Sequence, residues 1–272
     1  MALACWWLLV ARAPLASPAR ATAWSESASP GPSRAWYSGA WYSASRLWPV
    51  RRAPKVALQI GHEDVQAHPD ELHRLRWNTG GYAAGVYELD VNRAVVAHLQ
   101  ARLHAAGIEV EVLPATVPRG YRADIFLSVH ADSVSDPQRN GYKSAYFEPL
   151  RNPYDVSFKE HIDKAYLAAS RLPDDSLNVS PAMREFYAFN HYAYAHSVHP
   201  STPSLIVEMG YISNVRDRAY LLKASEPADA LYRGIVSYLQ AQGRLPRRQP
   251  RASVIRIPEL HAEAMRVRLP AR

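Results

Sequence analysis

The chain has 272 residues, of which 48% are hydrophobic and 21% charged, enough for one sizeable α/β core with tails. Its net charge of +7 lies at the two ends: residues 1–54 carry six Arg and one acidic residue, and residues 244–272 carry eight Arg and two acidic residues. Residues 55–243 therefore have a net charge of −4. An enzyme acting on nucleic acid carries positive charge on its folded surface, so this distribution argues against a nucleic-acid partner.

The N-terminal part predicts export rather than a folded domain. Residues 2–10 form an apolar run followed by Arg12 and small residues, so residues 1–23 are expected to be a secretory signal. The run is too short to span a bilayer. Residues 24–54 are rich in Ser, Ala, Pro and Trp and predict a flexible linker, unless the true start of the protein lies downstream of part of this segment.

Short apolar segments alternate with helical patterns from residue 55 onward. The clearest helix covers residues 88–106, where Val91, Val95 and Leu99 recur four apart on one face. Strands are predicted over residues 55–60, 108–113, 124–130, 141–147 and 205–208, and further helices over residues 155–170, 216–224 and 227–242. Strands separated by helices predict an α/β three-layer sandwich, with a mostly parallel twisted sheet and helices on both faces.

Two connections in this core, residues 61–87 and 172–203, are longer than a compact domain normally needs. Loops of this length are usually functional, so both are expected to contribute to a site. The folded core domain is expected to cover residues 55–243. Residues 244–272, with several prolines and eight Arg, are expected to form a basic tail.

Three strands each end in a side chain suited to metal binding or acid–base chemistry. His62 follows the apolar run that starts at Val56, His130 ends residues 125–130, and Glu208 ends residues 204–208. Because open α/β sheets build their sites at the carboxyl ends of strands, we expect these side chains to meet at one edge of the sheet. The pattern predicts a metal-assisted hydrolase.

The residue types available favour zinc held by His and carboxylate ligands. Cys5 is the only cysteine, which excludes a cysteine-based zinc site. A hydrolytic zinc site needs three protein ligands and one open position, and His62, Glu88 and His130 supply such a set. Glu88 falls in the first turn of a predicted helix, where the helix dipole favours a carboxylate. Glu208 is the candidate general base.

Five segments in the order of the chain form recognisable signatures. They are Gly61-His62, Glu88-Leu89-Asp90-Val91-Asn92, Tyr121-Arg122-Ala123-Asp124, Ser128-Val129-His130-Ala131 and Val207-Glu208-Met209-Gly210-Tyr211-Ile212-Ser213-Asn214. Over residues 55–242 the chain resembles the zinc-dependent N-acetylmuramoyl-L-alanine amidases, type 3. The resemblance implies that His62, Glu88 and His130 hold Zn²⁺ and that Glu208 is the catalytic acid/base. It also implies cleavage of the amide between the lactyl group of muramic acid and L-alanine in peptidoglycan.

The sequence departs from the family pattern beside two proposed ligands. It reads Gln59-Ile60-Gly61-His62-Glu63-Asp64 where the family usually has Asp-Pro-Gly-His-Gly-Gly, and Asp132 stands in place of the usual Asn. The ligands themselves are intact, so the departures bear on substrate specificity. Two alternatives therefore stay open: a zinc peptidase or amidase acting on another acylated amino-acid substrate, and a non-catalytic wall-binding module.

Several other groups can be interpreted either as ordinary surface residues or as functional ones. His191, His196 and His199 lie in a Tyr-rich loop and are expected to be surface or substrate-facing residues rather than metal ligands. Arg122 either pairs with a carboxylate near the zinc site or is a simple surface charge. The basic tail is a solvated arm or adheres electrostatically to anionic wall polymers or a membrane surface. The expected location is extracellular or periplasmic, at the cell wall.

Overall fold

A computed structural model describes residues 52–246 of the chain. The predicted signal over residues 1–23, most of the linker 24–54 and most of the tail 244–272 lie outside the described residues. At the C-terminal boundary, Leu245 packs against the hydrophobic core and Arg244 forms an ion pair with Asp124. None of the helices in the described part is long and apolar enough to cross a membrane.

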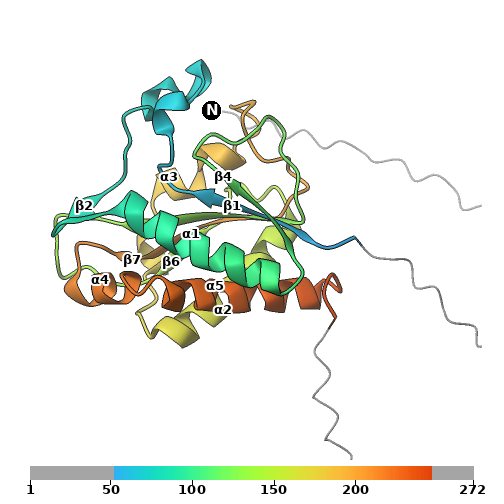
Figure 1. Cartoon of the computed structure of the whole chain (residues 1–272). Coiled ribbons are helices and arrows are strands. Elements are labelled where there is room, and N and C mark those ends of the chain that lie inside the picture. The colour runs from blue at the N-terminus through green and yellow to red at the C-terminus, as the bar shows by residue number, and fades with distance from the viewer. Residues whose placement is uncertain (1–51, 247–272) are drawn as a thin grey trace, which may run out of the picture. The chain divides into compact units, whose positions relative to one another are not determined.

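The centre of the fold is a five-stranded sheet in the order β4-β1-β5-β7-β6 (Figure 1). Its strands are β1 (Lys55–Ile60), β4 (Glu109–Leu113), β5 (Ile125–Asp132), β6 (Lys143–Ala145) and β7 (Ser204–Tyr211). All neighbouring pairs are parallel except β6 with β7, so β6 is an antiparallel strand at the edge. This mixed, mostly parallel sheet confirms the predicted fold class.

Three long helices cover one face of the sheet. They are α1 (Glu88–Ala105), α2 (Pro153–Ser170) and α5 (Ser225–Ala241), and the shorter α4 (Val215–Leu221) precedes α5. In Figure 1, α5 lies between α1 and α2, and it packs against both. The core beneath them is mainly aliphatic and includes Leu99, Leu127 and Ile235, all fully buried. This is the layer that the four-residue periodicity of residues 88–106 predicts.

The other face is covered mostly by the two long connections. Short α3 (Pro181–Arg184) and the 3₁₀ turns Ser176–Asn178 and Tyr187–Phe189 lie in the second connection, and the 3₁₀ turns Val65–Ala67 and Asp70–Leu75 lie in the first. Their core is aromatic: the rings of Phe126, Phe186 and Phe189 pack edge-to-face. The outer layers are therefore unequal, because aromatic side chains fill the second face without a long helix.

Several element boundaries differ from those predicted. The central strand runs on to Asp132 and the last strand to Tyr211, so His130 and Glu208 lie inside strands rather than at their ends. Conversely, residues 141–147 give only the three-residue β6. The helix predicted from residue 155 begins at Pro153, because the Asn152 side chain caps it by accepting a hydrogen bond from the Tyr154 backbone N–H.

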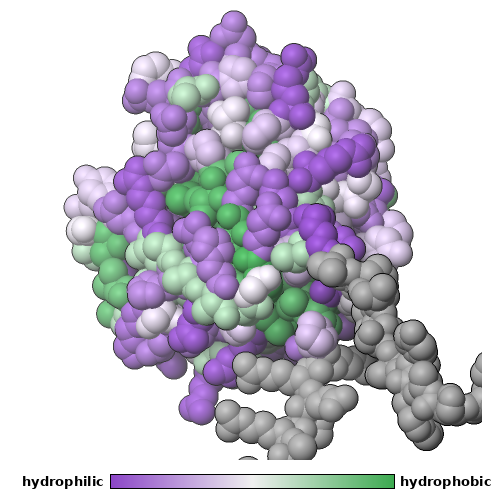
Figure 2. Space-filling model, turned by 45° about the vertical axis from the view of Figure 1, so that its right-hand side comes forward, coloured by the Kyte–Doolittle hydropathy of each residue, from purple (hydrophilic) through white to green (hydrophobic). Residues whose placement is uncertain are grey.

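Hydrophilic residues cover most of the face in Figure 2, with hydrophobic residues gathered between them.

Candidate metal centre

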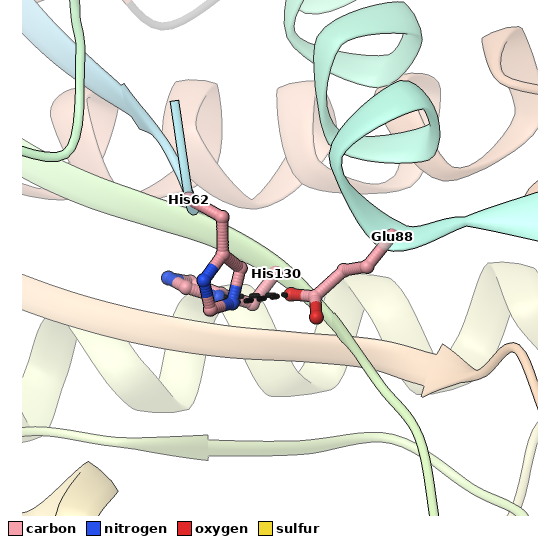
Figure 3. A group of neighbouring side chains, drawn as sticks. All are labelled: His62, Glu88 and His130. Carbon is pink, nitrogen blue, oxygen red and sulfur yellow. Dashed lines mark hydrogen bonds and ion pairs between the residues drawn. The ribbon is translucent and has the colours of Figure 1, made fainter. Parts of the chain in front are cut away.

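His62, Glu88 and His130 converge at the carboxyl edge of the sheet (Figure 3). They come from the turn after β1, the first residue of α1 and the interior of β5. Glu88 Oε1 lies 3.2 Å from His62 Nε2 and 3.0 Å from His130 Nδ1, and one ligand atom from each residue lies within 4.8 Å of the others. Ligand atoms about 3.3 Å apart are what tetrahedral zinc with bonds of about 2.0–2.1 Å requires. The two distances from Glu88 Oε1 therefore fit a zinc-sized cation.

The tautomer of His62 supports a cation between these side chains. His62 Nδ1 lies 2.7 Å from the carbonyl oxygen of Asn78, which can only accept a hydrogen bond. Neutral His62 therefore carries its proton on Nδ1, and Nε2 directs a lone pair toward the Glu88 carboxylate. Two acceptors facing each other at 3.2 Å repel unless a cation or a proton lies between them. A metal ion would satisfy both.

Glu88 is held in place by backbone and side-chain donors. Its Oε2 accepts a hydrogen bond from the Gly81 N–H at 2.8 Å, and its Oε1 accepts from the Asn92 side chain and the Ala131 N–H, both at 3.3 Å. Burial opposes ionisation of Glu88, but hydrogen bonds with His130 and His62 outweigh it, so the pKa of Glu88 lies well below its usual range. The carboxylate is thus a pre-formed anion, as a metal ligand should be.

The two histidines differ in their electrostatic environment. Burial lowers the pKa of His62, but the hydrogen bond to Glu88 and the charge of Glu88 outweigh burial and raise it. His130 is more deeply buried, and burial lowers its pKa despite the same carboxylate. His130 Nε2 is buried without a hydrogen-bond partner in the described part of the chain. A neutral, metal-bound imidazole suits this environment better than an imidazolium.

Two glycines make room for the histidine rings. A Cβ atom at Gly61 would lie 2.4 Å from the His130 ring. At Gly80, where φ is +86°, a Cβ would lie 2.9 Å from the His62 ring. The sequence analysis did not predict this packing role for either glycine. The close approach shows that the ring positions require both residues to be glycine.

Glu208 lies beside the three converging side chains without joining them. It is paired with His130 across β5 and β7, so both side chains project from the same face of the sheet. Glu208 is partly buried, and its Oε2 has no hydrogen-bond partner in the described part. Burial raises the pKa of Glu208 well above its usual range, Glu88 and Asp132 raise it further, and Lys143 opposes them.

Lys143 is a buried charge that the sequence analysis missed. It is paired with Glu208 across β6 and β7, so Glu208 lies between His130 and Lys143 in one row. Lys143 Nζ donates to Asp132 Oδ2 at 2.5 Å and to the Tyr211 hydroxyl at 2.7 Å. The only signal in the sequence was a lysine within an apolar strand. Asp132, noted as a departure from the family pattern, is therefore the counter-charge of this lysine.

A cavity of about 580 Å³ opens beside the candidate metal centre. His62 and His130 line it together with residues of both long connections, including Leu72, Phe186 and Tyr187. The two connections are joined by Glu71, which lines the cavity and whose carboxylate accepts hydrogen bonds from the backbone N–H groups of Ala195 and His196 and contacts the His196 ring at 2.7 Å. Both connections thus contribute to the site.

The other residues that the sequence analysis singled out do not belong to the candidate metal centre. His191, His196 and His199 form no metal-binding group; among residues 52–246, only His62, Glu88 and His130 do. Arg122 contacts the His199 ring and donates to Ser201 Oγ at 3.0 Å, so its described partners do not include a carboxylate near the metal centre.

The fold and the site together define an α/β protein with a candidate metal centre at the carboxyl edge of a mostly parallel sheet. The family model for N-acetylmuramoyl-L-alanine amidase matches residues 56–237. The chain belongs to this family, which confirms the resemblance seen in the five signature segments.

Known proteins similar to this chain carry the same family name. N-acetylmuramoyl-L-alanine amidase LytC of Bacillus subtilis (strain 168) is 26% identical over 176 residues, which are 59% of this chain and 33% of LytC. The chain thus matches about a third of the length of that relative.

Two solved structures share the fold at lower identity. The N-acetylmuramoyl-L-alanine amidase from Clostridium difficile 630 has a TM-score of 0.51 at 16% identity, covering 70% of this chain and 99% of that one. Ami1 from Mycobacterium smegmatis has a TM-score of 0.51 at 21% identity, covering 70% and 98%. These likenesses concern the fold alone.

Proposed function

We propose that this chain is a zinc-dependent amidase that hydrolyses the amide between the lactyl group of N-acetylmuramic acid and L-alanine in peptidoglycan. Family membership supports the reaction. The observation that carries the metal assignment is the convergence of His62, Glu88 and His130, which would hold zinc and leave one coordination position open. Zinc bound there would supply Lewis acidity, polarising a carbonyl and lowering the pKa of water from 15.7 to about 7.

In this proposal Glu208 is the catalytic acid/base. It removes a proton from the water that adds to the amide carbonyl carbon and delivers a proton to the nitrogen of L-alanine. The C–N bond then breaks, leaving a carboxylate on the lactyl group and a free amine on the peptide. Support comes from the position of Glu208 next to His130 and from burial and neighbouring carboxylates, which raise its pKa, so that the carboxylate is a stronger base and retains the accepted proton until it passes to the amine.

The proposal also assigns roles to the parts of the chain. Residues 55–243 would form the catalytic domain, acting extracellularly or in the periplasm on the cell wall. Residues 1–23 would serve as a signal, and the basic residues in 24–54 and 244–272 would adhere to anionic wall polymers or a membrane surface.

Removing the two ends of the chain tests whether catalysis needs only residues 55–243 and whether the ends bind the wall. A protein that lacks residues 1–51 and 247–272 keeps Arg52 and Arg244, which both pair with Asp124. We expect unchanged turnover on soluble muropeptides and weaker binding to intact walls, with a difference that shrinks as salt is added. A truncated protein that is insoluble, or inactive on soluble substrate, would show that one of the ends belongs to the catalytic fold.

Digestion of purified peptidoglycan tests the reaction. We expect about one zinc per chain and the release of peptides whose new free amine belongs to L-alanine. His62→Ala protein, prepared in parallel, should bind less zinc and release little peptide. Zinc-loaded wild type that leaves peptidoglycan intact but cleaves other N-acyl amino acids would favour the broader amidase. Wall binding without release of any peptide would favour a binding module.

A further inference from the structure

A pair of exposed tyrosines lies on a small hairpin beside the metal centre. The hairpin consists of β2 (Tyr82–Ala83) and β3 (Val86–Tyr87), and Tyr82 is paired directly with Tyr87. The two ring centroids are 4.6 Å apart with a 42° tilt, and the residues are 59% and 57% exposed. The pair therefore presents apolar ring surface to solvent.

The hairpin is tied to the proposed ligand Glu88 at both of its ends. Tyr87 immediately precedes Glu88, and Tyr82 immediately follows Gly81. The Glu88 N–H donates to the Gly81 carbonyl at 2.9 Å, and the Gly81 N–H donates to Glu88 Oε2 at 2.8 Å. Figure 1 shows β2 beyond the N-terminal end of α1, where Glu88 lies. The tyrosine pair therefore lies at the rim of the metal centre.

The tyrosine pair is separate from the cavity. Neither Tyr82 nor Tyr87 lines the 580 Å³ cavity, whose wall comes from the segments around Leu72 and Phe186. The other neighbours of the hairpin base are Ser133 and Ile212, which follow β5 and β7. The tyrosine rings therefore offer a substrate bound at the candidate metal centre a contact surface outside the cavity.

The chemistry of this surface suits a sugar ring. The face of an aromatic ring carries partial negative charge and attracts the weakly positive C–H bonds on one face of a pyranose, while the sugar hydroxyls remain in water. We propose that Tyr82 and Tyr87 form a platform that stacks on a hexosamine ring of the glycan strand. This inference rests on the proposed function. The platform binds the sugar side of the substrate and contributes to specificity rather than to the chemical step.

A structural role for the pair must be distinguished from this binding role. Cross-strand aromatic pairs stabilise hairpins, and this hairpin supports Glu88. Loss of support for Glu88 would impair turnover of every substrate. Loss of a sugar platform would impair only substrates that carry the sugar.

The test compares two substrates with the same scissile amide. One is a disaccharide–peptide from peptidoglycan, and the other is the D-lactoyl peptide that remains after the sugars are removed. We expect Tyr82→Ala and Tyr87→Ala each to lower kcat/KM for the disaccharide–peptide by about tenfold through KM, and to leave the lactoyl peptide unchanged. Tyr82→Phe should retain binding because it keeps the ring. Tyr154→Ala is the matched control, since Tyr154 is 54% exposed on α2, away from the hairpin.

Equal losses on both substrates, or no loss on either, would overturn the platform. Binding of a peptide-free hexosamine oligosaccharide, measured by calorimetry on the zinc-loaded protein, provides a readout that does not need turnover. If wild type cleaves neither peptide but binds the oligosaccharide and Tyr82→Ala does not, the amidase proposal fails and the platform stands. If wild type cleaves both peptides and Tyr82→Ala matches it in every measurement, the platform alone fails.

Discussion

The two faces of the sheet are built in different ways and serve different purposes. Leu127 and Val129 of β5 belong to the aliphatic core under the long helices, whereas His130 of the same strand contacts Phe186 on the other face, with ring centroids 5.9 Å apart. Glu208 and Lys143 share the face of His130. The helical face supplies a regular core and, at the start of α1, the proposed ligand Glu88, whereas the loop-covered face supplies the cavity and the row of His130, Glu208 and Lys143. Stability and chemistry are therefore expected to respond to different substitutions.

The largest stability effect should come from the helical face. Leu99 is fully buried in the core under α1, so Leu99→Ala removes packing and leaves a cavity. We expect a loss of about 2–5 kcal/mol in the free energy of unfolding, with kcat per folded molecule unchanged. Denaturant titration and active-site-normalised turnover measure the two quantities. A comparable loss of kcat in the folded protein would show that the helical face is coupled to the chemistry.

A buried carboxylate under the same layer should make stability depend on pH. Asp155 is fully buried, accepts a hydrogen bond from the Ser204 N–H at 2.7 Å, and lies 3.8 Å from Arg151. Burial raises the pKa of Asp155 from 3.8 to about 6, so folding favours its protonated form. The stability that this group contributes is fully present below pH 3.8 and is lost as pH rises through about 6.

Asp155→Asn removes this titration and keeps the hydrogen bond from Ser204. Relative to wild type, the unfolding free energy of the variant should shift in its favour by on the order of 3 kcal/mol between pH 3.5 and pH 8. The attraction of the ionised carboxylate to Arg151 is already part of this difference, because it lowers the Asp155 pKa and so offsets part of the effect of burial. Parallel urea titrations at several pH values measure it, and a difference that does not vary with pH would be inconsistent with the buried carboxylate.

A smaller effect is expected where the two long connections meet on the loop-covered face. Glu71→Gln weakens the hydrogen bonds that join Glu71 to Ala195 and His196. We expect KM to rise a few-fold as the cavity wall loosens, with a stability change of about 1 kcal/mol or less. Glu226→Gln, which breaks an exposed ion pair with Lys223 on the helical layer, is the control and should leave KM unchanged. The same KM for both variants would show that the hydrogen bonds of Glu71 do not contribute to substrate binding.

The helical face was largely predictable from sequence because its pattern is local and periodic. The spacing of Val91, Val95 and Leu99 predicts α1, and apolar runs predict β1, β5 and β7. The convergence of His62, Glu88 and His130 was also predictable. The carboxyl ends of parallel strands meet at one edge of the sheet, and the signature segments of the family contain all three residues in the same order along the chain.

The loop-covered face was not predictable in the same way. Its contacts join residues far apart in the chain, such as Lys143 with Tyr211, and no repeating pattern marks them. The opposition of His130 and Glu208 depends on the register between β5 and β7, which single-strand patterns do not determine. The hairpin of Tyr82 and Tyr87 lies in the long connection 61–87, for which the sequence analysis predicted no strand.

The most direct test of the central claim compares two glutamates in one experiment: zinc content and turnover of Glu88→Gln and Glu208→Gln, each with and without excess zinc. Glu208→Gln should keep its zinc while kcat falls by on the order of 10²–10⁴, because an amide cannot accept the proton. Glu88→Gln should lose zinc first, and added zinc should restore part of its activity, because a neutral ligand binds the metal more weakly. Loss of zinc by Glu208→Gln, or near-normal turnover of that variant, would contradict the assignment of metal ligand and acid/base.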